Sequence, residues 1–251
     1  MNLATVRAIQ VRSSGAEEIQ DRVAVEGKFR LFLNGTLFSE LVASGEQLAE
    51  LGAGFVVCQG LAGEVEEVTA DGQDIRVTAL IDGGLVREII STGAVGTRRP
   101  FRPVRTDLTL TPGEVFSITR EIETDAWRQT GGVHCSVLFH EHALQVKSSD
   151  VGRHNTVDKV IGHAVLRGLD RSRCVLGCTG RQPRDMVAKA AHAGIPVVIS
   201  RAASTDLGIA AAREAGITLV CFSRGDRFTI YSHPERILGE DAELGGVKEA
   251  K

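Results

Sequence analysis

The segment from Asp150 to Lys159, DVGRHNTVDK, brings five ionisable side chains and one amide together within ten residues. Apolar residues then recur at helical spacing, at Val157, Val160, Ile161, Ala164 and Val165, so we expect a helix from about Asn155 that buries one face. The polar cluster would lie at the helix N-terminus, where free N–H groups and the helix dipole favour an anion. Arg153 and His154 would add donors there. The alternative is an ordinary helix start, capped by Asp150 or Asn155 and surrounded by solvated charges.

Three loops place an arginine where a predicted strand ends. The loops are Thr179–Arg181, Ser200–Ser204 and Ser223–Arg227. Parallel strands bring such loops to one edge of a sheet, which is where ligands bind in open α/β proteins. A helix terminus supplies only about 0.3–1 kcal/mol towards an anion, whereas micromolar binding needs about 8 kcal/mol. Arg181, Arg201 and Arg224 could close that gap with charge-assisted bonds, and the alternative is that they only solvate a surface.

The segment TGGVHCSVLF, from Thr130 to Phe139, holds a histidine and a cysteine next to each other. On a strand, Cys135 shares a face with Val133 and Val137, so we expect a core thiol, since a reactive one needs exposure and a lowered pKa. His134 points to the other face. It either faces the ligand edge or is a structural, hydrogen-bonded histidine.

Composition bounds the class of protein. The 251 residues are 43% apolar and 24% charged, which predicts a folded chain, and the length predicts two domains. The net charge of −3 predicts neither nucleic acid nor a membrane surface as partner. No apolar run approaches the ~20 residues that span a bilayer, and no signal-peptide core is found near Met1, so we expect a cytoplasmic protein.

The five cysteines form no paired pattern, so we expect reduced thiols. Cys174 and Cys178 fall in one predicted strand, and at ~3.3 Å per residue their side chains lie roughly 13 Å apart. One zinc ion cannot bind both, so both are expected to be buried hydrophobic residues, and no metal bound by the protein is expected.

The first half of the chain alternates like an antiparallel sheet. Asn34-Gly35 predicts a hairpin between strands 29–33 and 36–38. Ser44 and Gln47 predict a capping box before a helix of about four turns that starts near Leu48 and stops at Gly60. Strands are expected at 65–70, 75–81 and 85–90, followed by a glycine-rich loop at 91–99.

The second half alternates strands and helices, which predicts parallel strands under right-handed crossovers. Strands are expected at 133–139, 174–178, 195–200 and 217–222, with helices at 183–193 and 205–215. Prolines near 100–112 indicate a boundary between a smaller β-rich α+β domain, 1–110, and an α/β domain, 111–251.

Together these segments resemble the formate dehydrogenase accessory protein family (FdhD/NarQ). The similarity runs from about Arg22 to Ile237 and rests on specific motifs, which are TGGVH at 130–134, DVGRHNTVDKVIG at 150–162, TGR at 179–181, AGIPVVIS at 193–200 and AGITLVCFSRGDRFTIYSHPERI at 215–237. VEGKFRLFLNG and LGAGFVVCQGL match more loosely in the first half.

The resemblance implies a sulfur carrier that receives sulfur from a cysteine desulfurase and passes it to the molybdenum or tungsten bis-pterin guanine dinucleotide cofactor of formate dehydrogenase. GDP is a surrogate for that ligand. The resemblance also implies a three-layer C-terminal domain of the cytidine deaminase type with a mostly parallel sheet, and a homodimer. The family's guanine-dinucleotide segment falls on Phe222, Ser223, Arg224, Gly225, Asp226 and Arg227.

One departure from the family concerns its sulfur-carrying CGxCG loop, which reads Thr92-Gly93-Ala94-Val95-Gly96 here. Neither Thr92 nor Val95 can hold a persulfide. One alternative is therefore a protein that binds the cofactor without covalent sulfur transfer. Another is a sulfurtransferase that uses Cys135 or Cys58, and a third is a deaminase-type hydrolase, for which His140-Glu141-His142 is a weak match.

Overall fold

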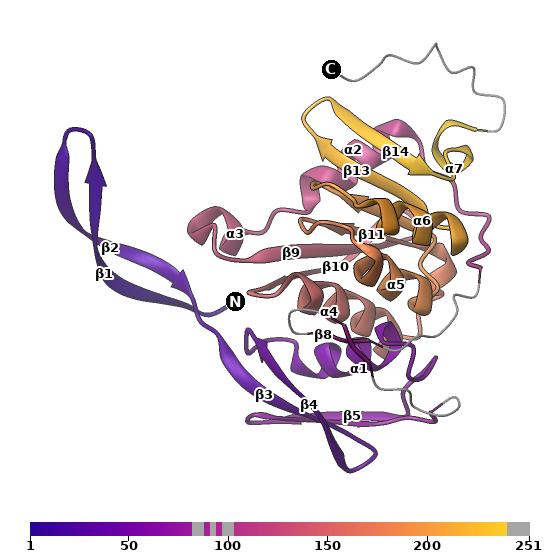
Figure 1. Ribbon diagram of the computed structural model, residues 1–251, viewed down its shortest axis with the longest axis horizontal. Helices are drawn as coiled ribbons and strands as arrows, with labels where there is room; N and C mark the ends of the chain where they lie inside the picture. Colours follow the sequence, from indigo (N-terminus) through magenta and orange to yellow (C-terminus); the bar gives the residue numbers. More distant parts are fainter. Residues whose placement is uncertain (82–87, 91–93, 97–102, 240–251) are drawn as a thin grey trace.

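The computed structural model describes residues 1–81, 88–90, 94–96 and 103–239 (Figure 1). The larger of its sheets has six strands in the order β10-β9-β11-β12-β13-β14. Their bounds are β9 His134–His140, β10 Ala143–Asp150, β11 Cys174–Cys178, β12 Val197–Ser200, β13 Thr218–Arg224 and β14 Arg227–Ser232. The pairs β11–β12 and β12–β13 are parallel, as predicted, whereas β9–β10, β9–β11 and β13–β14 are antiparallel. The sheet is therefore mixed, and the expectation of a mostly parallel sheet is wrong, because three of its five strand pairs are antiparallel.

Helices cover both faces of this sheet. Three of them contribute to one buried cluster on the first face, and their bounds are α4 Arg153–Leu166, α5 Arg184–Ala193 and α6 Asp206–Glu214. On the second face lie α2 Pro112–Glu121 and the single turn α7 Glu235–Leu238. Short α3 Asp125–Thr130 and the 3-10 turn η1 Arg171–Arg173 complete this half. The α/β class predicted from the sequence is confirmed.

A smaller sheet with the order β4-β3-β6-β5 packs against α1 Leu48–Cys58. Its strands are β3 Gly27–Leu33, β4 Thr36–Ala43, β5 Glu67–Asp71 and β6 Asp74–Thr78. The hairpin at Asn34-Gly35 is confirmed, and both residues have the positive φ values (50° and 79°) that a type I′ turn requires. β3 and β6 run parallel, with α1 between them in the chain, so the first half is not the simple antiparallel sheet that was predicted.

The predicted capping box before α1 is wrong. The N-cap is Gln47, which has a left-handed backbone and no side-chain cap bond. The Ser44 hydroxyl bonds to residues of β10, and the Gln47 side chain accepts a hydrogen bond from Ser148. Both side chains thus form hydrogen bonds with residues about 100 positions later in the chain. The local sequence around α1 does not reveal such long-range contacts.

Several elements were not predicted, which are α2, α3, α7, η1, β1, β2, β8, β10 and β14. β1 Leu3–Arg12 and β2 Gly15–Ala24 form a hairpin that extends away from the body of the molecule (Figure 1). The short strands β7 Glu88–Ile90 and β8 Ala94–Gly96 pair with each other, so part of the predicted loop 91–99 is a strand. Thr92 lies outside the described residues.

Helices α1 and α4 cross at two glycines. A Cβ atom on Gly54 would lie 1.7 Å from the Asp158 carbonyl oxygen, and one on Gly162 would lie 1.8 Å from the Glu50 carbonyl oxygen. Only glycine permits so close an approach. Ala53, Val57 and Cys58 of α1 therefore belong to the same buried cluster as α4 and α5. The two predicted domains share a core, and their boundary at residue 110 stays a prediction.

Candidate functional site

A pocket of about 520 Å³ opens at the carboxyl ends of the parallel strands. It is lined by Trp127, Gly131, Gly132, Val133, His134, Val151, Thr179, Arg201, Ala202 and Arg224. Small-ligand sites commonly enclose roughly 300–1,000 Å³. The pocket therefore has the size of a ligand site and lies at the sheet edge that the sequence predicted.

Arg201 and Arg224 reach this pocket from different strands. Arg201 follows β12, and Arg224 is the last residue of β13. A bulge in β13 between Cys221 and Arg224 leaves Phe222 with a φ of 52°, and the Phe222 N–H donates to the Ala202 carbonyl at 3.0 Å. This bond ties the two strand ends together, so both guanidinium groups face one volume.

The third arginine of the predicted set, Arg181, is exposed and does not line the pocket. The remaining residues of the predicted guanine-dinucleotide segment also lie apart from it. Ser223 is fully buried and its hydroxyl lies 2.5 Å from the Thr119 hydroxyl, Gly225 and Asp226 form the turn between β13 and β14, and Arg227 begins β14. Within this segment, Arg224 alone lines the pocket, while the Phe222 ring lies 5.8 Å beneath its guanidinium carbon.

His134 lies at the pocket wall and is hydrogen-bonded as well. Its Nδ1 is 3.1 Å from the Thr179 hydroxyl, and Thr179 also accepts from the Cys135 N–H. Burial lowers the pKa of His134, and the nearby Arg153 guanidinium lowers it further. His134 is therefore both a hydrogen-bonded structural histidine and a residue of the ligand edge, because its imidazole is held by Thr179 and still lines the pocket.

Arg153 and His154 occupy the first turn of α4. The Arg153 side chain packs against Gly180, where an added Cβ would lie 3.1 Å from the Arg153 Cβ. The Arg153 Nε and the His154 Nδ1 are buried atoms without a hydrogen-bond partner among the described residues. Burial, and secondarily Lys189, lower the pKa of His154 to about 3. His154 is therefore a neutral imidazole at physiological pH.

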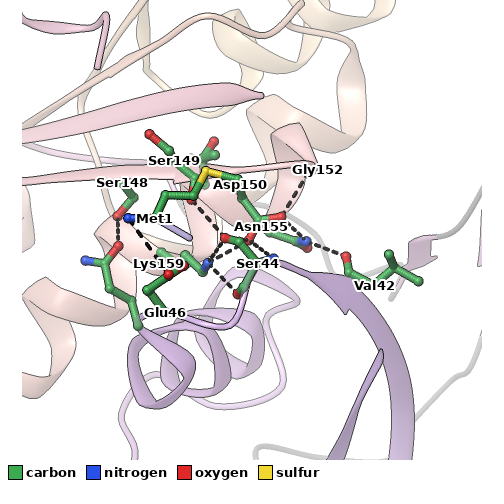
Figure 2. Close-up of polar contacts among 12 residues, drawn as sticks. Met1, Val42, Ser44, Glu46, Ser148, Ser149, Asp150, Gly152, Asn155 and Lys159 are labelled. Atoms are coloured by element: carbon green, nitrogen blue, oxygen red, sulfur yellow. Dashed lines mark hydrogen bonds and ion pairs between the residues drawn. The ribbon is translucent and has the colours of Figure 1, made fainter. Parts of the chain in front are cut away.

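Asp150 and Lys159, at the two ends of the same motif, have a structural role (Figure 2). Asp150 accepts hydrogen bonds from the Ser44 N–H and hydroxyl, from the Gly152 N–H, from the Asn155 amide and from the Lys159 ammonium. The N-cap of α4 is Gly152, so the alternative of a helix start capped by Asp150 or Asn155 is wrong. Their side chains instead connect α4 to the loop before α1.

A second buried ion pair lies deeper between the helices. The Lys189 ammonium on α5 is 2.7 and 2.8 Å from the two oxygens of Asp158 on α4. Cys58 of α1 lies beside this pair, and burial, together with the Asp158 charge, raises the pKa of its thiol well above the ordinary value. The densest motif of the chain thus divides in two, with the half-buried Arg153, His154 and Asn155 in the first turn of α4, outside the pocket lining, and Asp150, Asp158 and Lys159 inside the protein.

All five cysteines are free and buried, as expected. Burial raises the pKa of Cys174 and Cys221 to about 12 and that of Cys178 to about 11. The Cys135 sulfur has no exposed surface and lies 3.1 Å from the Thr124 hydroxyl. Neither Cys135 nor Cys58 has the exposure that a reactive thiol needs. The side chain of Val95 is not described.

His140, Glu141 and His142 lie where β9 turns into β10. Glu141 pairs with Arg173, and His142 pairs with Glu114. Across residues 1–81 and 103–239, no group of three or more His, Cys, Asp or Glu side chains is placed to hold a metal ion. No helix in the described part of the chain has the length and apolar character needed to cross a membrane.

Sequence reasoning missed Trp127 and Glu123. Trp127 is the only tryptophan of the chain, and α3 carries it to the pocket wall. Glu123 precedes α3 and forms an ion pair with Arg201. A lone aromatic and a lone acid between two short helices give no periodic signal, so only the structure reveals these positions.

The fold and the pocket define an α/β protein with a cationic site at the carboxyl ends of its parallel strands. The FdhD/NarQ family model matches residues 24–238, and the chain belongs to this family. The β1–β2 hairpin lies almost wholly outside the matched part.

Curated relatives extend over nearly the same length. The chain is 33% identical to the sulfur carrier protein FdhD of Methanothermobacter thermautotrophicus, over 88% of this chain and 93% of that protein. It is 30% identical to the sulfur carrier protein FdhD of Bacillus subtilis, over 88% and 92%. A crystal structure from Desulfotalea psychrophila, described as a formate dehydrogenase accessory protein, superposes with a TM-score of 0.81 at 32% identity, covering 94% of this chain and 99% of that one.

Proposed function

We propose that this chain is an accessory protein of formate dehydrogenase maturation that binds the molybdenum or tungsten bis-pterin guanine dinucleotide cofactor in the pocket of Arg201 and Arg224. The observation that carries the proposal is that these two guanidinium groups, from separate strands, line one pocket with His134 and Thr179. Guanidinium groups bind phosphate oxygens in bidentate geometry. The relatives are named as a sulfur carrier protein and as a formate dehydrogenase accessory protein. These names connect the proposed ligand with formate dehydrogenase.

The donor set fits a diphosphate linked to a ring system. Arg201 and Arg224 supply positive charge, Thr179 and His134 supply neutral hydrogen-bonding groups, and Trp127 offers a flat aromatic wall. Arg153 and His154 lie in the first turn of α4 and do not line the pocket, so they are not counted among its donors. The pocket of about 520 Å³ would hold the nucleotide end of the large cofactor, for which GDP is a suitable probe.

We propose that the chain retains cofactor binding without the persulfide relay of the family. Thr92 and Val95 replace the two cysteines that the family resemblance implies, and neither side chain can carry a sulfur atom. The cysteines of the chain are buried, and the four whose pKa is shifted are all shifted upwards. Both observations favour binding over transfer.

Transfer through another thiol is the second candidate, with Cys135 and Cys58 as the residues to test. Incubation with a cysteine desulfurase and cysteine would add about 32 Da, one sulfur atom, if a persulfide formed. We expect no adduct by mass spectrometry. An adduct that is lost in Cys135→Ala or Cys58→Ala would establish the second candidate instead.

Titration with GDP, followed by calorimetry, tests the binding proposal. Removing one charge-assisted contact of about 1.5–3 kcal/mol weakens binding roughly 10- to 100-fold, which we expect for Arg224→Ala. Arg181→Ala is the matched control, because this arginine also follows a strand but lies outside the pocket, and it should bind GDP like the unmodified protein. Equal affinity of the Arg224→Ala and unmodified proteins, or no binding by either, contradicts the proposal.

We propose the catalytic subunit of formate dehydrogenase as the partner that is served, with a cysteine desulfurase as the family's sulfur donor. Complementation of a strain that lacks its own accessory protein, measured as formate dehydrogenase activity, tests this role. Activity would mean that the cysteine pair of the family is dispensable. A homodimer and a deaminase-type arrangement of the large sheet remain predictions, and light scattering tests the first of them.

A further inference from the structure

Arg201 already has an anionic partner inside the protein. The Glu123 carboxylate lies between α2 and α3, and its Oε1 forms an ion pair with the Arg201 guanidinium. The Glu123 side chain is 19% exposed and that of Arg201 is 29% exposed, so the pair is largely shielded from water. Within the described part of the chain, no ion pair joins Arg224 to a carboxylate. The two arginines of the pocket therefore differ, because one is neutralised and the other is available.

A phosphate group that binds Arg201 must compete with Glu123. If both anions stay close to the same guanidinium, they repel each other, and this repulsion is stronger where water is partly excluded. If Glu123 leaves, its ion pair is lost. In both cases, Glu123 lowers the affinity of the pocket for an anion. Ligands with several negative charges are favoured, because their attraction to the arginines offsets the repulsion or the lost ion pair.

Thr124, the residue after Glu123, connects the ion pair of Arg201 to the pocket wall at Trp127. Thr124 is the N-cap of α3 and accepts a hydrogen bond from the Trp127 N–H, while its hydroxyl also lies 2.6 Å from the Ser149 hydroxyl. Glu123 and Thr124 thus join the guanidinium of Arg201 to the start of the helix that carries Trp127. A displacement of Glu123 would occur four residues before Trp127, so the fluorescence of this tryptophan is a suitable readout.

We infer that Glu123 is an internal counter-ion of Arg201, which a diphosphate displaces on binding, so that Glu123 restricts the pocket to polyanionic ligands. The inference rests on the proposed function, because it concerns the same pocket. Glu123 is a positioning and specificity residue and contributes no bond to the ligand. Its effect on affinity is exerted through Arg201, which is the nearer of its two basic partners, because the Arg128 Nε lies 4.0 Å from the Glu123 Oε2.

Glu123→Gln tests the inference, because it removes the charge and keeps the shape. Inorganic pyrophosphate and GDP are titrated against each purified protein, with Trp127 fluorescence and calorimetry as readouts. We expect Glu123→Gln to bind both probes about tenfold more tightly than the unmodified protein. Glu121→Gln is the matched control, because it removes the same charge two residues earlier from a pair with Lys147, and its affinities should not change.

Two further variants separate the mechanism from a general charge effect. In the Arg201→Gln background, the gain from Glu123→Gln should disappear, and a gain that persists overturns the inference. Glu123→Asp keeps the charge but withdraws it by one methylene, so a smaller gain is expected, and this variant carries the test if Glu123→Gln does not fold.

The outcomes distinguish the two proposals. Equal or weaker binding by Glu123→Gln, while the unmodified protein binds GDP through Arg224, overturns the counter-ion and leaves the proposed function standing. Tighter binding of pyrophosphate by Glu123→Gln, with no binding of GDP by any variant, supports the counter-ion and contradicts the proposed function. Failure of every variant to bind either probe overturns both.

Discussion

The ammonium nitrogen of Lys159 lies 2.6 Å from a carboxylate oxygen of Asp150, and neither side chain has any exposed surface. The Ser44 carbonyl and hydroxyl complete the coordination of the ammonium at 3.1 and 2.9 Å. Lys159 thus satisfies its hydrogen bonds with groups from both halves of the chain. Removing one member of such a pair leaves a buried charge without compensation.

Lys159→Met is therefore expected to lower the free energy of unfolding by about 3–5 kcal/mol, measured by urea denaturation. Arg12→Gln, which breaks the exposed pair with Glu17, is the control and should cost no more than about 1 kcal/mol. In the double variant Asp150→Asn/Lys159→Met, the loss should be smaller than the sum of the single losses. A loss below about 1 kcal/mol for Lys159→Met would contradict this account.

Gly54→Ala should separate α1 from α4. Alanine is about 1 kcal/mol better than glycine inside a helix, so propensity alone predicts stabilisation. The added Cβ would lie 1.7 Å from the Asp158 carbonyl oxygen, however, and backbone cannot move aside easily. We expect a net loss of about 3 kcal/mol, the upper end of the usual range of about 1–3 kcal/mol for overpacking in a core, because the clashing atom belongs to the backbone. Gly63→Ala has open space around it and should unfold like the unmodified protein.

His154 makes stability depend on pH. Its pKa is about 3 in the folded protein and about 6.5 in an unfolded chain, so the unfolded state binds the extra proton between these values. Stability is therefore complete above about pH 6.5 and falls as the pH drops through this window. In His154→Asn, the loss of unfolding free energy between pH 7 and pH 5 should be smaller.

The thiols should resist modification in the native protein. Because the cysteines are buried and burial raises the pKa of Cys58, Cys174, Cys178 and Cys221, thiolate and access are both scarce. We expect slow reaction with a disulfide reagent at pH 7 and reaction of five thiols in denaturant. A single thiol that reacts within seconds in the native protein would contradict the described burial.

Local signals predicted much of the fold. Asn34-Gly35 fixed a hairpin, and Gly194 and Gly216 marked the ends of α5 and α6 with positive φ values. β1 and β2 were missed because their side chains are mostly exposed, so hydrophobic alternation along them is weak. The mixed sheet was missed because β10 is largely polar and the direction of β9 depends on its partners.

The sequence predicted the sheet edge at which the site lies, but not which of the candidate side chains lie together there. The positions of Arg201 and Arg224 follow from strands that end side by side, which the sequence pattern reveals. The separation of Arg181 from them depends on how one loop turns after β11. Asp150 and Lys159 have the same polar character as Arg153 in the sequence, and only packing against Ser44 assigns them to the interior.

The glycine crossing of α1 and α4 has a consequence for any attempt to divide the protein. Expressed alone, the segment from Pro112 onwards would lack Ser44 as the partner of Lys159, and it would expose the apolar surface that Ala53 and Val57 cover. Such a fragment should aggregate rather than yield an isolated pocket. Crystallisation trials and ligand screens therefore require the two halves in a single polypeptide.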